Sequence, residues 1–230
     1  MTIRVLIVDD SALIRSLIGT IVEQQPDMQL VGAAPDAYAA RDMVNKYKPD
    51  VITLDIEMPK VDGLTFLDKL MKARPTPVLM ISTLTEKGAD ATLRALEVGA
   101  VDFIAKPKLG IREGIQQYQE VIVEKIRQVA KAKVERVNVS TVTTPTRLPL
   151  LSTEKIIAIG ASIGGTEAIK NVLMAMPANS PAVVLTQHMP PGFTTSFAKR
   201  LNDCCSLTVK EAEHGERILP GNAYLAPGAM

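Results

Sequence analysis

The sequence predicts an α/β protein with two parallel sheets, of which the first is doubly wound and has five strands. Between residues 5 and 105, five short apolar runs alternate with four segments of helical periodicity, an order typical of parallel sheets. A further apolar run at 156–159 follows a stretch rich in Thr, Ser, Val and Pro, which indicates a linker and a second α/β unit. With 230 residues the chain suits one or two domains, and 47% apolar composition is enough to form their cores.

Apolar periodicity places the elements of the first unit, and turn-forming residues bound them. The strand-like runs are continuously apolar, whereas the helical segments repeat apolar side chains every three or four residues. Pro49 stops the second helix, Asp62-Gly63 turns into the third, and Gly99 caps the fourth. The expected strands are 5–8, 28–33, 51–54, 77–81 and 101–105, and the expected helices are 11–21, 37–47, 64–72 and 86–98.

Polar side chains follow the expected strands at their carboxyl ends. Asp9, Asp10, Asp55, Ser82 and Lys106 all hold such positions, and ligands bind at this edge of a parallel sheet. Each aspartate taken alone would be a helix cap or turn residue. Three carboxylates at one edge repel one another unless a cation joins them, and oxygen ligands favour Mg²⁺. The pattern predicts a magnesium site in which Asp55 accepts a phosphoryl group.

These residues lie in motifs that together resemble bacterial response-regulator receiver domains. The resemblance covers about residues 2–125, so a receiver domain with a flavodoxin-like fold is assigned to residues 1–125. The motifs are Leu6-Ile7-Val8-Asp9-Asp10, Leu54-Asp55-Ile56-Glu57-Met58-Pro59 with Asp62-Gly63, Ile81-Ser82, and Phe103-Ile104-Ala105-Lys106-Pro107.

The receiver resemblance implies a role for each of these residues. A histidine kinase would phosphorylate Asp55, and Mg²⁺ would bind Asp9, Asp10, Asp55 and the backbone carbonyl of Glu57. Family members also often have a cis bond before the proline that matches Pro107. The residues that would respond to the phosphoryl group are Ser82, Phe103 and Lys106.

A basic connector follows the first unit. A helix is expected from 113 to 133, with apolar residues along one side, closing the receiver sheet and then running outward. Residues 138–149 have no helical period, so residues 126–153 are assigned to a helix extension and linker. Its basic residues could contact nucleic acid or an anionic surface, but the absence of interleaved aromatic residues favours a solvated linker.

A serine turn opens the second unit, which is assigned to residues 154–230. The run Gly160-Ala161-Ser162-Ile163-Gly164 fits the G-x-S-x-G pattern, in which a serine stands between a strand and a helix. This context would lift the Ser162 hydroxyl to the carboxyl edge of a sheet, where N–H groups of the next helix could stabilise an oxyanion. Two other interpretations of this run are a strand-to-helix turn whose serine has no catalytic role, and a phosphate-binding turn.

His188 is the expected partner of this serine. Residues 182–186 predict the next strand, and His188 lies just past its carboxyl end. Hydrogen-bonded to Ser162, the imidazole could accept the hydroxyl proton and later protonate a leaving group. A lone histidine in a loop is more often inert, and His214, in a polar loop, is expected at the surface.

Three segments of this unit carry a second resemblance: Gly160-Ala161-Ser162-Ile163-Gly164-Gly165-Thr166-Glu167-Ala168-Ile169, Gln187-His188-Met189-Pro190-Pro191-Gly192-Phe193-Thr194, and Ala223-Tyr224-Leu225-Ala226-Pro227-Gly228. They resemble the catalytic domain of the chemotaxis protein-glutamate methylesterases, the CheB family, in which a receiver precedes this domain. The resemblance implies hydrolysis of glutamate methyl esters, and deamidation of glutamines, on chemoreceptor helices. Ser162 would be the nucleophile and His188 the general base, and phosphorylation would relieve a block of the catalytic cleft by the receiver.

The chain departs from that family in two respects. Ile163 stands where the family commonly has threonine, which removes a hydroxyl beside the nucleophile. The family's catalytic aspartate lies beyond the segment matching Pro227-Gly228, so we expect this chain to lack it and to be impaired as an esterase. We also expect the second sheet to be incomplete, exposing apolar surface and a strand edge. The acids after His188 do not end any expected strand: Asp203, Glu211, Glu213 and Glu216.

The composition argues against several functional classes. A net charge of +1, 3% aromatic residues and no tryptophan disfavour a nucleic-acid surface. Membrane insertion is not expected, because no apolar run approaches the ~18 residues of a membrane helix. The adjacent Cys204 and Cys205 form no disulfide framework, which fits a cytoplasmic protein. Two functions remain open, a phosphorylation-gated esterase and a phospho-switch module that acts through protein binding without catalysis. A transcription factor fits the serine turn poorly.

Overall fold

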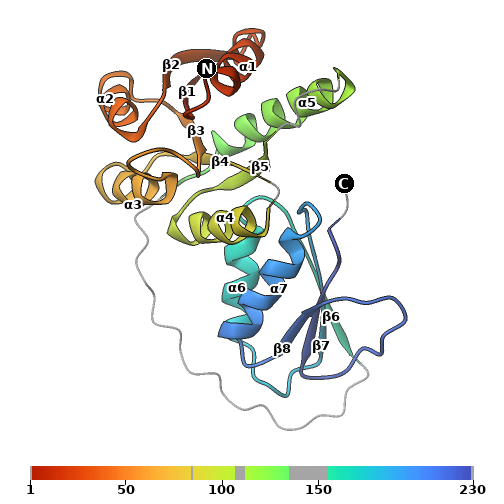
Figure 1. Cartoon of the computed structure of the whole chain (residues 1–230). Helices are drawn as coiled ribbons and strands as arrows, with labels where there is room; N and C mark the ends of the chain where they lie inside the picture. Colours follow the sequence, from red (N-terminus) through yellow and green to blue (C-terminus); the bar gives the residue numbers. More distant parts are fainter. Residues whose placement is uncertain (1, 84, 107–111, 135–154, 229–230) are drawn as a thin grey trace. The chain divides into compact units, whose positions relative to one another are not determined.

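The chain folds into two compact units, each built on one parallel sheet (Figure 1). The computed structural model describes residues 2–83, 85–106, 112–134 and 155–228. Within these ranges, none of the helices combines the length and the apolar character that crossing a bilayer requires.

The first unit is a doubly wound parallel sheet in the strand order β2-β1-β3-β4-β5, which confirms the predicted fold class. Every neighbouring pair in this sheet is parallel. Its elements are β1 (Ile3–Val8), α1 (Ala12–Glu23), β2 (Met28–Ala34), α2 (Ala37–Tyr47), β3 (Val51–Asp55), α3 (Gly63–Ala73), β4 (Val78–Ser82), α4 (Glu86–Val98), β5 (Asp102–Ala105) and α5 (Arg112–Val129).

Helices α1 and α5 share one core with the central strands. Ile18 of α1 and Ile122 and Ile126 of α5 pack in a single buried cluster with Val5 and Ile7 of β1, and all five side chains are 0% exposed. Burial of a side chain of this size contributes about 1.5–3 kcal/mol relative to exposure. The five-stranded sheet is thus sealed on this face by helices from opposite ends of the unit.

Aspartates fix where the helices α2 and α3 begin. The Asp36 carboxylate accepts hydrogen bonds from the backbone N–H groups of Tyr38 and Ala39, at 3.0 and 2.9 Å. The Asp62 carboxylate likewise accepts from the N–H of Thr65 at 2.8 Å. Side chains of this kind satisfy backbone donors that have no intrahelical partner, and each cap is worth about 1 kcal/mol.

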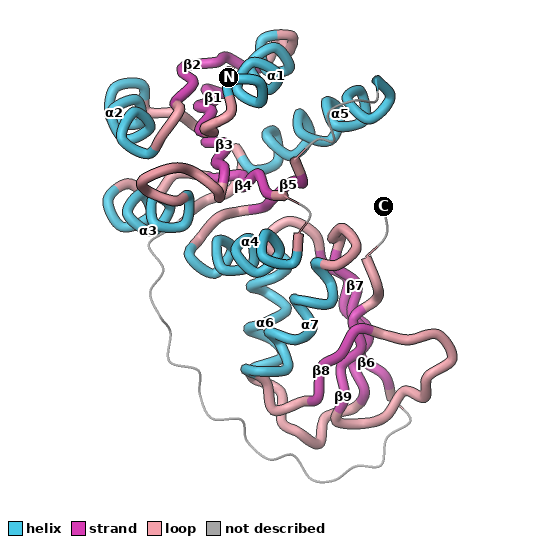
Figure 2. The backbone as a smooth tube through the Cα atoms, in the orientation of Figure 1, coloured by secondary structure: helices cyan, strands magenta, loops and turns pink. Residues whose placement is uncertain are grey.

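The second unit is a four-stranded parallel sheet in the order β6-β7-β9-β8. Helices α6 and α7 contact each other and lie side by side (Figure 2). The elements are β6 (Ile156–Ala161), α6 (Gly165–Met174), β7 (Ala182–Gln187), α7 (Phe193–Cys204), β8 (Thr208–Glu211) and β9 (Asn222–Leu225).

Strand β6 is an edge of this sheet within the described ranges, since its only recorded partner there is β7. The side chain of Ile156 is 53% exposed, and Ala158 and Gly160 on the same face are exposed too. Their partners in β7, Val184 and Thr186, are also incompletely buried. The expected exposed apolar strand edge is therefore confirmed in the second unit.

The predicted helix from 113 to 133 was wrong at its carboxyl end. Helix α5 stops at Val129, because the backbone N–H groups of Lys131 and Ala132 donate to the carbonyls of Gln128 and Val129, three residues back. Such bonds tighten the last turn and end an α-helix. The expected linker at 138–149 and the peptide bond before Pro107 lie outside the described residues.

Candidate functional site

The sheet of the first unit brings three carboxylates together. Asp9 follows β1 and Asp55 ends β3, and these neighbouring strands pair Val8 with Leu54, one residue earlier in each. Asp9 is 0% exposed and Asp55 1% exposed, whereas Asp10 is exposed. One ligand atom from each of the three aspartates lies within 4.8 Å of the others.

Lys106, directly after β5, supplies the positive charge of this acidic site. Its ammonium nitrogen Nζ lies 2.7 Å from Oδ2 of Asp55 and 3.4 Å from Oδ2 of Asp9. Burial raises the pKa of Asp55 to about 6, and the nearby charge of Asp9 adds to this rise while the hydrogen bond from Lys106 opposes it. Burial also raises the pKa of Asp9. The single positive charge of Lys106 therefore neutralises only part of the negative charge that Asp9 and Asp55 would carry when both are ionised.

The donor atoms of the acidic site fit a hard divalent cation. Oδ2 of Asp9 is buried and accepts no hydrogen bond in the described part of the chain; its recorded polar neighbour is the Lys106 ammonium at 3.4 Å, so a metal ion could take up its unused lone pairs. Oδ1 of Asp9 accepts from the N–H of Ser11 at 2.8 Å, and Oδ1 of Asp55 accepts from the N–H of Glu57 at 3.2 Å. These bonds orient both carboxylates, and carboxylate oxygens are the ligands Mg²⁺ prefers.

Ser82 and Phe103 are buried on the neighbouring strands β4 and β5. Ser82 ends β4 and is 1% exposed, and β4 pairs Ile81 with Asp55 of β3. Ser82 therefore reaches the same sheet edge as the acidic site, as predicted. Phe103 lies within β5 and is 4% exposed. Its role with Ser82 in sensing a phosphoryl group stays a prediction.

Arg15 is a member of this site that the sequence analysis missed. Its guanidinium nitrogen Nη1 donates to the backbone carbonyls of Asp9 and Asp10, at 2.8 and 2.9 Å. It thereby fixes the loop that carries both aspartates. The helical period of α1 places Arg15 on the first turn after Ser11, but only the folded loop brings the two carbonyls within its reach.

Magnesium is expected to stabilise the protein above, but not below, about pH 6. In metal-free protein the folded state keeps a proton on Asp55, whose pKa is about 6, while the unfolded state, at 3.8, loses it. The free energy of unfolding of the metal-free protein therefore falls between about pH 4 and pH 6. Mg²⁺ binds the ionised carboxylates, so it should raise the Tm near pH 7.5 by a few degrees, the effect of about 1 kcal/mol.

Circular dichroism melts in EDTA and in Mg²⁺, near pH 5 and pH 7.5, measure this effect. The matched control is Asp68→Asn, which removes an exposed carboxylate that pairs with Lys72, and it should leave the Mg²⁺ response intact. An equal Mg²⁺-induced Tm shift at both pH values would contradict the assignment.

The second sheet brings the predicted serine and histidine to one edge. Ser162 follows β6 and His188 follows β7, and these adjacent parallel strands pair Ala161 with Gln187. Paired positions on neighbouring strands lie about 4.8 Å apart, and both residues are exposed. Within the described residues, the structure records no hydrogen bond between the Ser162 hydroxyl and the His188 imidazole.

Two donors hold the backbone of the serine turn, and one of them was not predicted. The side-chain amide of Gln187 donates from Nε2 to the carbonyl oxygen of Ser162 at 2.9 Å, and the N–H of Gly165 donates to the same oxygen at 2.8 Å. The positive φ of the turn, 71°, falls on Gly164. Gln187 is adjacent to His188. The carboxyl end of β7 therefore carries the candidate base, His188, and also holds the turn that contains the candidate nucleophile, Ser162.

Replacing Gly165 with Ala should destabilise this turn. A Cβ at Gly165 would lie 2.2 Å from Oε1 of Gln187 and 2.6 Å from Cβ of Ala161. Overpacking of this kind costs about 1–3 kcal/mol, and displacement of Gln187 would also lose its hydrogen bond to Ser162, about 1 kcal/mol more. We expect a lower denaturant midpoint for the second unit and reduced amide protection from 160 to 170 in hydrogen exchange.

Gly160→Ala is the matched control, because a Cβ there would meet only Cγ2 of Thr186, at an ordinary 3.6 Å. Its stability should change by less than about 0.5 kcal/mol. Equal stability of the two alanine variants would show that Gln187 does not constrain the turn.

Glu211 corrects the expectation that no acid after His188 ends a strand. It is the last residue of β8, at the carboxyl edge of the sheet. Its carboxylate accepts hydrogen bonds from the hydroxyls of Thr194 and Thr195, at 2.5 and 2.6 Å, and Thr194 accepts from the N–H of Gly228 at 3.0 Å. The four-residue strand was too short to recognise from periodicity. Glu211 ties the start of α7 to the segment after β9.

Comparison with known proteins agrees with the two-unit organisation. A response regulator receiver domain model matches residues 5–117, and a CheB methylesterase model matches residues 157–230. The chain is 64% identical over 229 residues to a Pseudomonas aeruginosa protein named protein-glutamate methylesterase/protein-glutamine glutaminase 2, covering 99% of this chain. It is 59% identical over 229 residues to the protein-glutamate methylesterase/protein-glutamine glutaminase of Salmonella typhimurium, covering 98% of this chain.

The chain belongs to the CheB protein-glutamate methylesterase family. It spans 66% and 65% of the length of these two CheB relatives, respectively. The crystal structure of the response regulator domain of Thermotoga maritima CheB is also similar, with 47% identity and a TM-score of 0.53 over 58% of this chain and 99% of that domain. The first unit is therefore a CheB-type receiver, and the matched part of the second belongs to a CheB methylesterase domain.

Proposed function

We propose that the protein is a phosphorylation-regulated methylesterase that hydrolyses glutamate methyl esters, and deamidates glutamines, on the cytoplasmic helices of chemoreceptors. The observation that carries this proposal is the placement of Ser162 and His188 directly after a paired position on two adjacent strands. The names of the relatives support the substrate class, since they are protein-glutamate methylesterases and protein-glutamine glutaminases. The cytoplasm, where these helices lie, is the proposed location.

In this proposal Ser162 attacks the carbonyl carbon of the ester. The His188 imidazole takes the hydroxyl proton and returns it to the leaving methoxide, which departs as methanol. Water then attacks the acyl-serine with His188 again as base, the imidazole returns the proton to the Ser162 oxygen, and the receptor is released with a free γ-carboxylate on its glutamate side chain. N–H groups at the start of α6 that no intrahelical carbonyl uses would stabilise the oxyanion.

Regulation in this proposal begins at Asp55, which accepts a phosphoryl group from the histidine kinase of the chemotaxis system. Mg²⁺ would be held by Asp9, Asp10, Asp55 and the Glu57 carbonyl, and it supplies charge neutralisation when bound. Lys106, 2.7 Å from Asp55, neutralises the remaining charge. Ser82 and Phe103 would respond to the phosphorylated state.

A second candidate function is a phospho-switch that acts through protein binding alone. It is favoured by one observation: in the described part of the chain, no carboxylate is recorded as a hydrogen-bond partner of His188, and Glu211 is already engaged by two threonines. Loss of the orienting acid lowers turnover by about 10⁴ in a serine triad. Slow catalysis by this chain is therefore part of the proposal.

The experiment that tests the function uses a peptide from a chemoreceptor helix that carries a glutamate γ-methyl ester. Mass spectrometry follows conversion of the ester to the acid by the chain, with and without acetyl phosphate and Mg²⁺. We expect slow hydrolysis that phosphorylation accelerates. Phosphorylation without any ester hydrolysis would favour the binding module instead.

A further inference from the structure

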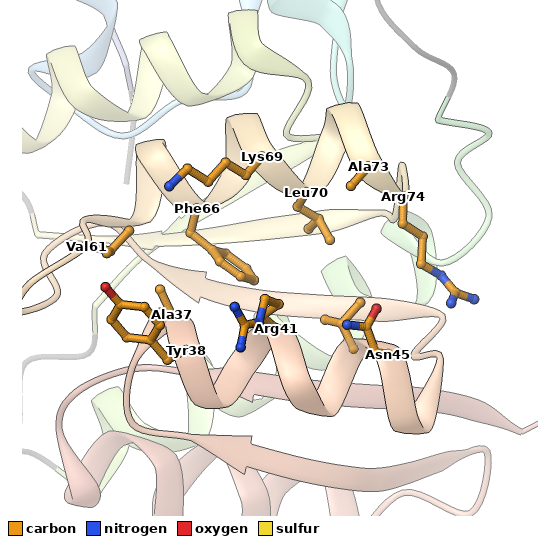
Figure 3. A pocket seen from close by; sticks show the side chains of 11 residues that line it. Ala37, Tyr38, Arg41, Asn45, Val61, Phe66, Lys69, Leu70, Ala73 and Arg74 are labelled. Carbon is orange, nitrogen blue, oxygen red and sulfur yellow. The ribbon is translucent and has the colours of Figure 1, made fainter.

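A groove between α2 and α3 of the first unit is distinct from the acidic site and the serine turn. It has a volume of about 320 Å³ and is lined by both helices and by Val61 (Figure 3). Its lining includes the apolar side chains of Val44, Phe66 and Leu70, and Figure 3 shows the Phe66 ring pointing from α3 toward α2. Ala37 and Ala73 line it too, and their small side chains leave the space open.

The rim of this α2–α3 groove is basic. Arg41, Lys69 and Arg74 line it, and no acidic side chain does. The guanidinium of Arg41 already pairs with Asp42 at 3.0 Å, whereas in the described part of the chain no ion pair is recorded for Lys69 or Arg74. Figure 3 shows these two side chains extending toward opposite ends of the groove. The positive charge is thus spread along the groove and does not converge on one point.

These features distinguish between possible occupants. A single phosphate or carboxylate would draw the cations to one spot, which the arrangement does not show. An extended strand needs free backbone N–H and C=O groups to pair with, and the walls here are helices whose backbone groups bond within the helix. The lining of α2 runs from 37 to 45, about 12 Å at 1.5 Å per residue, which matches two turns of a helix laid alongside.

We propose that the α2–α3 groove docks an acidic amphipathic helix of a partner protein. Apolar side chains at every third or fourth position of that helix would fill the space above Phe66 and Leu70. Carboxylates flanking this stripe would meet Lys69 and Arg74 at the rim. The interaction depends on neither Asp55 nor Ser162, so it stands or falls independently of the proposed catalysis.

The test uses the full 230-residue chain and a synthetic helical peptide with a leucine stripe flanked by glutamates. Fluorescence anisotropy gives the affinity, and amide chemical shifts locate the contact. Binding should perturb amides within 37–45 and 61–74. Lys69→Glu combined with Arg74→Glu should weaken binding by about tenfold or more. Ala73→Phe, which fills the groove and keeps both cations, should weaken binding by at least as much.

The control pair is Lys46→Glu with Lys72→Glu, which makes the same charge change at exposed positions of α2 and α3 that do not line the groove. It should retain most of the affinity, and a peptide with lysines in place of glutamates should not bind. The proposal is overturned by equal losses in both double variants, or by shifts confined to other surfaces. Binding of a small amphipathic carboxylate or a second copy of the chain, but not the peptide, would also overturn it.

Discussion

Asp55→Asn should eliminate phosphorylation of the chain by acetyl phosphate or by a histidine kinase. The carboxylate of Asp55 is the group that Lys106 contacts at 2.7 Å and that lies among the donors suited to Mg²⁺. An acyl phosphate forms when an ionised carboxylate oxygen attacks the phosphorus atom, and the uncharged side-chain amide of Asn lacks such an oxygen. We expect incorporation to fall by about 10³-fold or more, the scale on which phosphoryl transfer responds to loss of an essential group.

Intact-mass spectrometry after incubation with acetyl phosphate and Mg²⁺ measures this loss directly. Asp68→Asn serves as the matched control because the Asp68 side chain is 46% exposed and pairs locally, with Lys72 four residues later, and it should be phosphorylated like the unmodified chain. Phosphorylation of Asp55→Asn at the unmodified level would place the acceptor elsewhere, and Asp9 and Asp10 would then be the next residues to replace.

Ser162→Ala should abolish the burst of product that an activated ester gives on acylation of the protein. A serine nucleophile in a complete triad is worth about 10⁶ in kcat. In the described residues no carboxylate is recorded as a hydrogen-bond partner of His188, and a triad without its orienting acid loses about 10⁴ of that advantage. We therefore expect a further loss of about 10²-fold in steady-state turnover, together with complete loss of the acyl-protein.

Stopped-flow absorbance with p-nitrophenyl acetate measures the burst, and mass spectrometry of the quenched protein detects the acyl group. Ser206→Ala is the control, since Ser206 is exposed and lies outside the serine turn. A burst that persists in Ser162→Ala would assign acylation to another nucleophile, such as the exposed Cys204, and would remove Ser162 from the proposed mechanism.

The acidic site and the serine turn differ in how many of the contacts that orient their reacting side chains are already formed. At the acidic site, the ion pairs of Lys106 and the hydrogen bonds from Ser11 and Glu57 already orient Asp9 and Asp55. At the serine turn the backbone is fixed by Gln187, but in the described part of the chain no hydrogen bond joins the Ser162 hydroxyl to the His188 imidazole. Phosphorylation is therefore expected to be robust in this chain and esterase activity weak.

The amino-acid sequence by itself determined the order of strands and helices in the first unit and the strand-end placement of Asp9, Asp55, Lys106, Ser162 and His188. These features depend on local periodicity and on turn residues, which act over a few positions along the chain. Only the tertiary structure decided which carbonyls Arg15 reaches, that Gln187 anchors the serine turn, that Glu211 ends a strand and that α2 and α3 enclose a basic groove. Arg15 reaches carbonyls only five and six residues away, but through a loop whose shape no periodicity specifies. Glu211 lies in a strand too short to show its own period. The Gln187 bond and the groove join residues distant in sequence, which strand pairing and helix packing bring together only when the chain has folded.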